Sequence, residues 1–210
     1  MNKNQHMQKY SALHGMRNPM DSWSKSDSSF LQVKNESGIE VVEDWFIGKN
    51  DKDLSLRLQK AGPEHCKHLR MIQVWADITA PRYWWIEFDT YRAGVEKVSC
   101  STMHMLTSRP LSVGDFPGVD MPLSMLSQTV DNINNLMTAY KNATDLENRT
   151  SLWRSIIQLL PQSYMQKRTV MMSYAALRNI YRQRIGHKLV EWKQFRDWAA
   201  DLPESWMIIE

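Results

Sequence analysis

The segment 69–81, with the sequence LRMIQVWADITAP, constrains the fold more than any other stretch of the chain. Its apolar residues Ile72 and Val74 alternate with residues that face the other way, as in a β-strand with one buried side. Pro81 ends this strand and suits the first turn of a helix. The aromatic-rich residues 82–94 therefore predict a helix that closes at a glycine. A strand that leads directly into a helix indicates a mixed α/β fold.

Helical periodicity dominates the second half of the chain. Apolar residues recur every three or four positions from Leu123, which predicts a long helix after a loop at 108–122. The β-branched segment 39–48 predicts a strand. Further helices are predicted at 51–62, 151–160, 173–184 and 188–202. We therefore expect an α/β class of the mixed α+β kind: a single helix-rich domain with a central sheet over 39–210, preceded by an extended or partly disordered arm at 1–38.

The composition fits a soluble globular protein with a sizeable core. Hydrophobic residues make up 42% of the 210 residues, with nine tryptophans and fourteen methionines, and charged residues make up 23%. The net charge of +3 is small. Without a concentrated basic stripe, that charge does not indicate a nucleic-acid partner. No apolar run reaches the roughly 18–20 residues needed to cross a membrane.

The cysteines and the N-terminus bear on the cellular compartment. Cys66 and Cys100 are the two cysteines and form no Cys-x-x-Cys motif. A disulfide scaffold is therefore not expected, and we expect the protein to be in the reducing cytoplasm. Residues 1–15 lack the apolar region of a signal peptide.

The segment 178–192 is helical in its periodicity yet rich in basic residues. Arg184 lies on the same helical face as Leu177 and Ile180, so it extends an apolar stripe rather than the solvated side. An arginine in that position needs an anionic partner, because an unpaired buried charge costs free energy. Two partners are consistent with the spacing: a bound anionic ligand, or an internal salt bridge with Glu191.

Other reactive residues each allow a chemical and a structural interpretation. His65, Cys66 and His68 lie within four positions but lack further ligands at metal-site spacing, so no metal site is predicted. A histidine that contacts a cofactor, or one half-buried at the entrance to a strand, fits better. Cys100 is either a nucleophile activated by a nearby cation or an inert buried thiol.

The predicted helix at 82–94 is dense in aromatic residues. Helical spacing is expected to bury Tyr83, Phe88 and one of Trp84 and Trp85. Such a stripe is more typical of a core or a subunit interface than of a stacking platform for a ligand.

Two blocks of the sequence carry recognisable motifs. The first, 61–88, reads AGPEHCKHLRMIQVWADITAPRYWWIEF and contains a histidine-containing turn, a strand ending in Ala-Pro and an aromatic helix. The second, 159–192, contains a Leu-Pro pair, a strand and a downstream arginine. Both blocks resemble the flavin-dependent thymidylate synthases, which have these elements in the same order. The spacing from Leu-Pro to Arg184 agrees without gaps. Together the two blocks make up a little under a third of the chain.

The resemblance implies a reaction and its partners. The family transfers a methylene group from a folate to C5 of dUMP and reduces it with a flavin hydride. It works as a homotetramer with sites shared between subunits. The resemblance therefore implies a pyrimidine nucleotide as substrate, FAD as cofactor, reduced folate and NADPH as co-substrates, and a homo-oligomer.

The resemblance also implies roles for individual residues. Arg184 matches an arginine that binds and polarises the pyrimidine, and Lys167 or Arg168 matches the basic residue at the dUMP phosphate. Arg92 is assigned to phosphate binding as well. The residues that match flavin contacts are His65, Asn179 and either His187 or Lys188.

The family's Arg-His-Arg signature is not intact in this chain. The corresponding segment, 90–105, reads TYRAGVEKVSCSTMHM and keeps only Arg92. The family's next serine corresponds to Ser101 with a one-residue insertion and to Cys100 without it. The resemblance implies a divergent enzyme that modifies C5, with Ser101 on the nucleotide and Cys100 as a candidate for attack at C6. The alternative is a non-catalytic protein that kept the fold and binds or sequesters a nucleotide, or serves as an interaction scaffold.

Overall fold

The structure is a computed structural model that describes residues 11–34, 37–38, 40–118 and 121–210. The chain forms two compact units, each assembled from separate stretches of sequence. The first unit comprises Met1–Ala76, Tyr91–Glu96 and Val170–Glu210, and the second unit comprises Asp77–Thr90 and Lys97–Thr169. The boundary that the sequence suggests at residue 38 does not coincide with any boundary between the two units.

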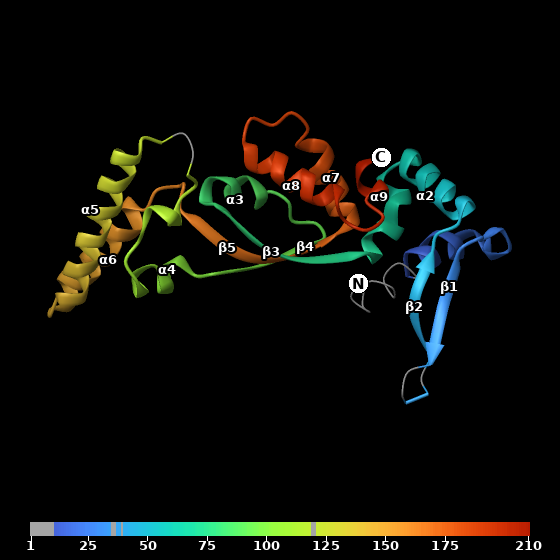
Figure 1. Cartoon of the computed structure of the whole chain (residues 1–210), viewed down its shortest axis with the longest axis horizontal. Coiled ribbons are helices and arrows are strands. Elements are labelled where there is room, and N and C mark those ends of the chain that lie inside the picture. The colour runs from blue at the N-terminus through green and yellow to red at the C-terminus, as the bar shows by residue number, and fades with distance from the viewer. Residues whose placement is uncertain (1–10, 35–36, 39, 119–120) are drawn as a thin grey trace. The chain divides into compact units, whose positions relative to one another are not determined.

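Helices and strands are mixed along the chain, as the sequence predicts (Figure 1). β1 pairs with β2, and a three-stranded sheet has the order β3-β5-β4. The strands are β1 (Ser29–Lys34), β2 (Glu40–Phe46), β3 (Gln73–Pro81), β4 (Val95–Ser99) and β5 (Met165–Ser173). The longer helices are α2 (Lys49–Ala61), η3 (Pro63–Met71), α3 (Arg82–Phe88), α5 (Leu123–Asn142), α6 (Leu146–Leu159), α7 (Tyr174–Gln183) and α8 (Val190–Ala200). Two short helices, α4 (Thr102–Met105) and α9 (Trp206–Ile209), are also present. The fold is therefore of the helix-rich mixed α/β class.

Residues 11–34, whose polar and serine-rich sequence predicts an extended arm, instead belong to the folded first unit. Residues 11–17 are helical, and β1 pairs with β2 in antiparallel register, with Ser29 opposite Phe46. These residues fold onto the unit because the helix at 11–17 carries apolar side chains, and their burial against other apolar side chains is favourable. The cluster consists of buried Leu13 and Met16 packed with Trp23, Phe30, Ile47, Leu54 and Leu58. The predicted arm's residues 1–10 and 35–36 lie outside the described part of the chain.

Asp51, in the first turn of α2, is fully buried and organises the loop that precedes β1. Its carboxylate accepts hydrogen bonds from Arg17 Nε at 2.6 Å, the hydroxyls of Ser26 and Ser28 at 2.7 and 2.6 Å, and the backbone amides of Asp27 and Ser28 at 3.2 and 3.1 Å. Burial alone would raise the pKa of Asp51, but these hydrogen bonds and the charge of Arg17 outweigh it and lower the pKa. One carboxylate therefore fastens the loop to α2.

The helix η3 takes up residues 69–71, which the sequence assigns to the start of a strand. Its inner face carries His68, which is buried, while His65 is exposed. Gln59 Nε2 donates to Ser55 Oγ at 3.2 Å, so the Ser55 hydroxyl is free to donate to His68 Nε2 at 2.9 Å. That arrangement suits a neutral imidazole. Burial, together with the positive charge of Arg178, lowers the pKa of His68 to about 4.

We expect the free energy of unfolding to fall as the pH drops from about 6.5 to 4. Over this range His68 binds a proton in the unfolded chain but stays neutral in the folded chain. A pKa lowered from 6.5 to about 4 corresponds to about 3 kcal/mol. The melting temperature measured between pH 7 and 4.5 should show the decline. His68→Gln should flatten it, and exposed His104→Gln should not. An equally steep decline in His68→Gln would contradict this assignment.

The aromatic helix α3 is shorter than predicted, and it buries more tryptophan. Trp84, Trp85 and Phe88 are all fully buried, whereas Tyr83 is half-buried, so the expectation of only one buried tryptophan is wrong. The Trp85 indole donates to the Gln166 carbonyl at 2.9 Å, which satisfies its N–H inside the second unit. The helix ends at Phe88 rather than near Gly94.

The second unit has its own core around α5 and α6, which lie side by side (Figure 1). On α5, Leu126, Val130, Ile133 and Met137 are buried at helical spacing, as the periodicity predicts. The core cluster also includes Leu106, Leu111, Phe116, Ile156 and Leu160. The Asp145 side chain caps α6 by accepting from the Asn148 amide at 2.7 Å.

The start of α7 is locked to the segment before β4. Ser173 caps the helix by accepting from the Ala176 amide at 3.2 Å, and its own amide donates to the Gly94 carbonyl at 3.0 Å. Gly94 has a φ of +71°, and a Cβ there would lie 2.7 Å from Ser173 Oγ. Both conditions require glycine. Within the first unit, this contact holds the Tyr91–Glu96 segment against the start of α7.

Candidate functional site

The second unit contains a cavity of about 270 Å³, here called the Cys100 pocket. It brings together Cys100, Ser101 and Lys167, three residues predicted from the sequence that lie on two separate segments. The Cys100 amide donates to the Lys167 carbonyl at 3.0 Å, which joins these segments directly. The other lining residues are Thr79, Thr102, Met105, Arg109, Gly114, Asp115, Tyr164, Met165 and Gln166.

The two residues that compete for the family's serine position differ in their surroundings. Ser101 caps the short helix α4, with its Oγ accepting from the His104 amide at 3.3 Å. Its hydroxyl proton is left to donate elsewhere. Cys100 is an exposed free thiol, which corrects the interpretation of a buried inert one. The pocket therefore offers a hydroxyl donor and an accessible sulfur side by side.

Lys167 and Arg168, the two candidates for a phosphate, have different environments. The Lys167 ammonium lines the pocket and lies 2.8 Å from Asp77 Oδ2, with both side chains more than half exposed. Hydrogen bonds from Lys167 and Thr169 lower the pKa of Asp77. Because exposed ion pairs are weak, an entering phosphate can compete for Lys167.

Arg168 does not line the pocket. Its Nη1 lies 2.9 and 3.1 Å from the two carboxylate oxygens of Asp89, and it also donates to Gln166 Oε1 at 3.0 and 3.1 Å. Its guanidinium stacks over Trp85 at 4.4 Å. Lys97 lies 2.8 Å from the same Asp89. These contacts give Arg168 a structural role, so Lys167 is the better phosphate candidate.

A tight ion pair also lines the Cys100 pocket. Arg109 donates to Asp115 through both terminal nitrogens, with Nη1–Oδ2 at 2.8 Å, and the Ser112 amide donates to the same carboxylate at 2.8 Å. The hydrogen bond from Arg109 outweighs partial burial and lowers the pKa of Asp115 to about 2. Burial raises the pKa of Tyr164 beside it.

In the first unit, Arg184 is held between two aromatic rings. Its guanidinium carbon lies 4.3 Å from the centre of Trp192 and 5.3 Å from the centre of Tyr91, and its Nε donates to the Tyr91 hydroxyl at 2.7 Å. The His187 ring meets Trp192 edge-on at 6.1 Å. Tyr91, Arg184, His187 and Trp192 are named the Arg184 cluster. Its contacts fix the plane of the guanidinium, as a bidentate contact requires.

The remaining predicted residues lie on exposed positions of the first unit. His65 pairs with Glu64 at 3.5 Å, Asn179 accepts from Gln183 at 2.9 Å, and Arg92 is exposed on the turn before Gly94. None of them lines the Cys100 pocket.

Comparison with solved structures gives a fold but no sequence family. No family model and no curated protein matches the sequence. A crystal structure of the flavin-dependent thymidylate synthase ThyX from Helicobacter pylori, complexed with FAD and dUMP, superposes with a TM-score of 0.68 and 17% identity. A second structure of that protein with FAD and dUMP gives 0.67 and 17%. Each match covers 96% of this chain and 93% of the other. The chain has the thymidylate synthase ThyX fold.

The ThyX-fold resemblance at sequence level did not point to Arg109, Asp115 or Tyr164, although all three line the pocket. Arg109 and Asp115 lie in 106–150, where no match to the family is recognisable, and Tyr164 lies in the block 159–192 but has no role implied by the resemblance. One signal was present: Ser112 and Asp115 have the spacing of a capping box, and the structure forms it. That spacing predicts a local turn but says nothing of a pocket.

Neither a metal centre nor a membrane-spanning helix is found in the part of the chain that the structure describes. Among those residues, no group of three or more His, Cys, Asp or Glu side chains is arranged to hold a metal ion. Likewise, none of the described helices is both long and apolar enough to cross a bilayer.

Proposed function

We propose that this chain binds a pyrimidine deoxynucleotide resembling dUMP, together with FAD, and modifies C5 of the pyrimidine by methylation or a related one-carbon transfer. The observation that carries the proposal is the Cys100 pocket, which gathers Cys100, Ser101 and Lys167 from separate segments. Its volume of about 270 Å³ is slightly below the range of about 300–1,000 Å³ common for small-molecule sites, so it suits part of a nucleotide.

The roles proposed for these residues are given for each unit by itself. In the second unit, Lys167 would contact a phosphate and the Ser101 hydroxyl would donate to a nucleotide. In the first unit, Arg184 would bind the carbonyl edge of a pyrimidine and Arg92 would add a cation for a phosphate. A guanidinium of fixed orientation stabilises negative charge that develops on the ring during attack from C5.

Cys100 is assigned as the nucleophile. Its thiolate forms a bond to C6, the π electron pair of the C5–C6 double bond moves to C5, and C5 bonds to the methylene carbon carried by the reduced folate. Loss of the C5 proton then breaks the bond between that carbon and the folate nitrogen, which releases the folate as its amine and leaves a methylene group on C5. A hydride, which bound FAD would supply, would reduce that methylene to a methyl group as the C6–S bond breaks and the thiolate leaves. An exposed thiol beside Lys167 is accessible for this step.

The residues proposed for FAD fit a flavin in their hydrogen-bonding chemistry. Asn179 offers an amide, and His65 and His187 offer imidazoles, which together can donate to and accept from the edge of a flavin ring. His187 is the best held of the three because it lies against Trp192. Bound FAD would supply the reducing equivalents, with NADPH as their source. The proposal includes a cytoplasmic homo-oligomer, with the tetramer favoured by the resemblance.

A specific observation supports a second candidate, a protein that holds a nucleotide without modifying it. The cations near the Cys100 pocket already face carboxylates: Lys167 faces Asp77 and Arg109 faces Asp115. In addition, only Arg92 remains of the Arg-His-Arg signature. Both facts lower the positive charge available to phosphates, which would weaken binding and slow any transfer.

The deciding experiment is a visible absorption spectrum of the purified protein before and after addition of FAD and dUMP. We expect a bound-flavin spectrum that changes on adding dUMP, followed by product when reduced folate and NADPH are supplied. Cys100→Ser should keep both binding signals and lose product. A protein that binds dUMP but ignores flavin supports the holding function instead. A protein that binds neither refutes both candidates.

A further inference from the structure

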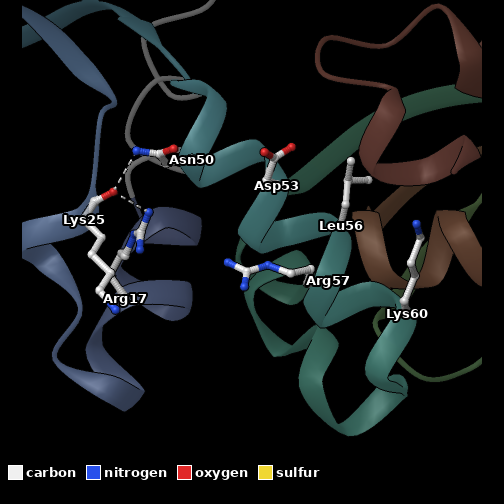
Figure 2. A pocket seen from close by; sticks show the side chains of 7 residues that line it. All are labelled: Arg17, Lys25, Asn50, Asp53, Leu56, Arg57 and Lys60. Carbon is white, nitrogen blue, oxygen red and sulfur yellow. Dashed lines mark hydrogen bonds between the residues drawn. The ribbon is translucent and has the colours of Figure 1, made fainter.

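The first unit contains a larger cavity, of about 600 Å³, between α2 and the loop that follows residues 11–17. Figure 2 shows its lining side chains, which come from Arg17 at the end of the helical residues 11–17 and from Lys25 on one side, and from successive turns of α2 on the other. They are Arg17, Lys25, Asn50, Asp53, Leu56, Arg57 and Lys60. This set, here called the α2 pocket, shares no residue with the Cys100 pocket.

The loop wall of the α2 pocket is held in place by buried contacts. The Arg17 side chain is only 4% exposed, and its charge is matched by the fully buried Asp51. Its Nη2 also donates to the Lys25 carbonyl at 3.1 Å, and Asn50 Nδ2 donates to the same carbonyl at 3.4 Å (Figure 2). Lys25 is therefore fixed at its backbone, while its ammonium stays exposed. The site is built before any ligand arrives.

The charges left in the α2 pocket favour an anion. Within the described residues, Lys25, Arg57 and Lys60 make no ion pair and no side-chain hydrogen bond. These three cations share the pocket with one carboxylate, Asp53, which leaves an excess of two positive charges. Like charges gathered around one cavity repel one another, and a bound dianion would relieve that repulsion.

The spacing along α2 gives the ligand a definite chemical class. Asp53, Arg57 and Lys60 are separated by four and three residues, so they lie on one helical face. Arginine binds phosphate oxygens through its planar fork, and lysine binds them as a point charge. Asp53 and Asn50 supply acceptors for a hydroxyl or amine on the same ligand, and Leu56 supplies an apolar contact.

We propose that the α2 pocket binds a phosphorylated small molecule carrying at least two negative charges, such as a diphosphate ester of nucleotide size. Lys25, Arg57 and Lys60 contact the phosphates, and Asp53 contacts the polar group at the other end. This binding does not depend on the proposed function, because it involves neither the Cys100 pocket nor the Arg184 cluster.

The test is isothermal titration of the full chain with inorganic pyrophosphate at low salt. We expect binding that weakens at least tenfold in Arg57→Gln and again in Lys60→Gln. Both residues are exposed helix positions, so the fold should survive, and melting temperature checks this. Lys67→Gln removes one exposed positive charge from η3 in the same unit and is the matched control, with unchanged affinity expected.

Three results would overturn the proposal. The first is no pyrophosphate binding at millimolar concentration, and the second is equal binding in Arg57→Gln and wild type. The third is binding of an oligonucleotide that pyrophosphate does not displace and that salt abolishes steeply, which would assign the surface to nucleic acid. Loss of product in Cys100→Ser with unchanged pyrophosphate binding would bear on the proposed function alone, since Cys100 lies outside the α2 pocket.

Discussion

Asp51→Ala is expected to lower the free energy of unfolding by about 3–5 kcal/mol, which is the range for breaking a buried ion pair by removing one partner. The carboxylate is fully buried and accepts five hydrogen bonds, so the variant leaves Arg17 charged, buried and uncompensated. Two serine hydroxyls and two backbone amides would lose their acceptor as well. Urea denaturation followed by circular dichroism measures the change.

The matched control for Asp51→Ala lies two residues further along α2. Asp53→Ala removes the same group from an exposed position, and a change within about 0.5 kcal/mol is expected. If both variants lost the same stability, the buried network would not be the cause. Because the folded pKa of Asp51 is lowered, its stabilisation is complete above the unfolded value of 3.8 and is lost as the pH falls below that value.

Arg184→Lys is expected to weaken dUMP binding by about 100-fold, or roughly 2.7 kcal/mol. Lysine keeps the charge but loses the planar fork and the flat surface that stacks against Trp192 and Tyr91. It also loses the Nε hydrogen bond to the Tyr91 hydroxyl. Titration of the protein with dUMP, followed by fluorescence or calorimetry, measures the affinity.

Arg196→Lys is the control for that variant. Arg196 stacks over Tyr181 at 4.3 Å, the same distance that separates Arg184 from Trp192, and it lies in the same unit. It belongs to neither predicted site, so dUMP affinity should stay within about twofold, less than 0.5 kcal/mol. A similar loss in both variants would mean that stacked arginines support the fold rather than the nucleotide.

The sequence predicted those parts of the fold that depend on local periodicity. The apolar spacing of Leu126, Val130, Ile133 and Met137 identified α5, and the alternation around Ile72 and Val74 identified β3. Each pattern repeats within a few residues, and the apolar residues that form it are the ones that the structure buries.

The sequence failed where distant residues decide the outcome. Arg168 looked available for a phosphate, but Asp89, 79 positions away, binds it. The sequence around His65 and His68 did not distinguish a buried histidine from an exposed one. Only His68 is buried, where its ring forms a hydrogen bond with the Ser55 hydroxyl on α2. The α2 pocket was missed because Arg17 lies in a polar segment that resembles an arm, and its buried partner is 34 positions away.

The path of the chain between the two units has a consequence for dissection of the protein. The backbone leaves the first unit after Ala76, returns at Tyr91, leaves again after Glu96 and returns at Val170. Neither unit is therefore a continuous piece of sequence that a simple truncation could isolate. A nick in one linking segment would leave both units still tied by the others. Genes encoding either unit alone would need their segments rejoined by new linkers, in the manner of a circular permutation.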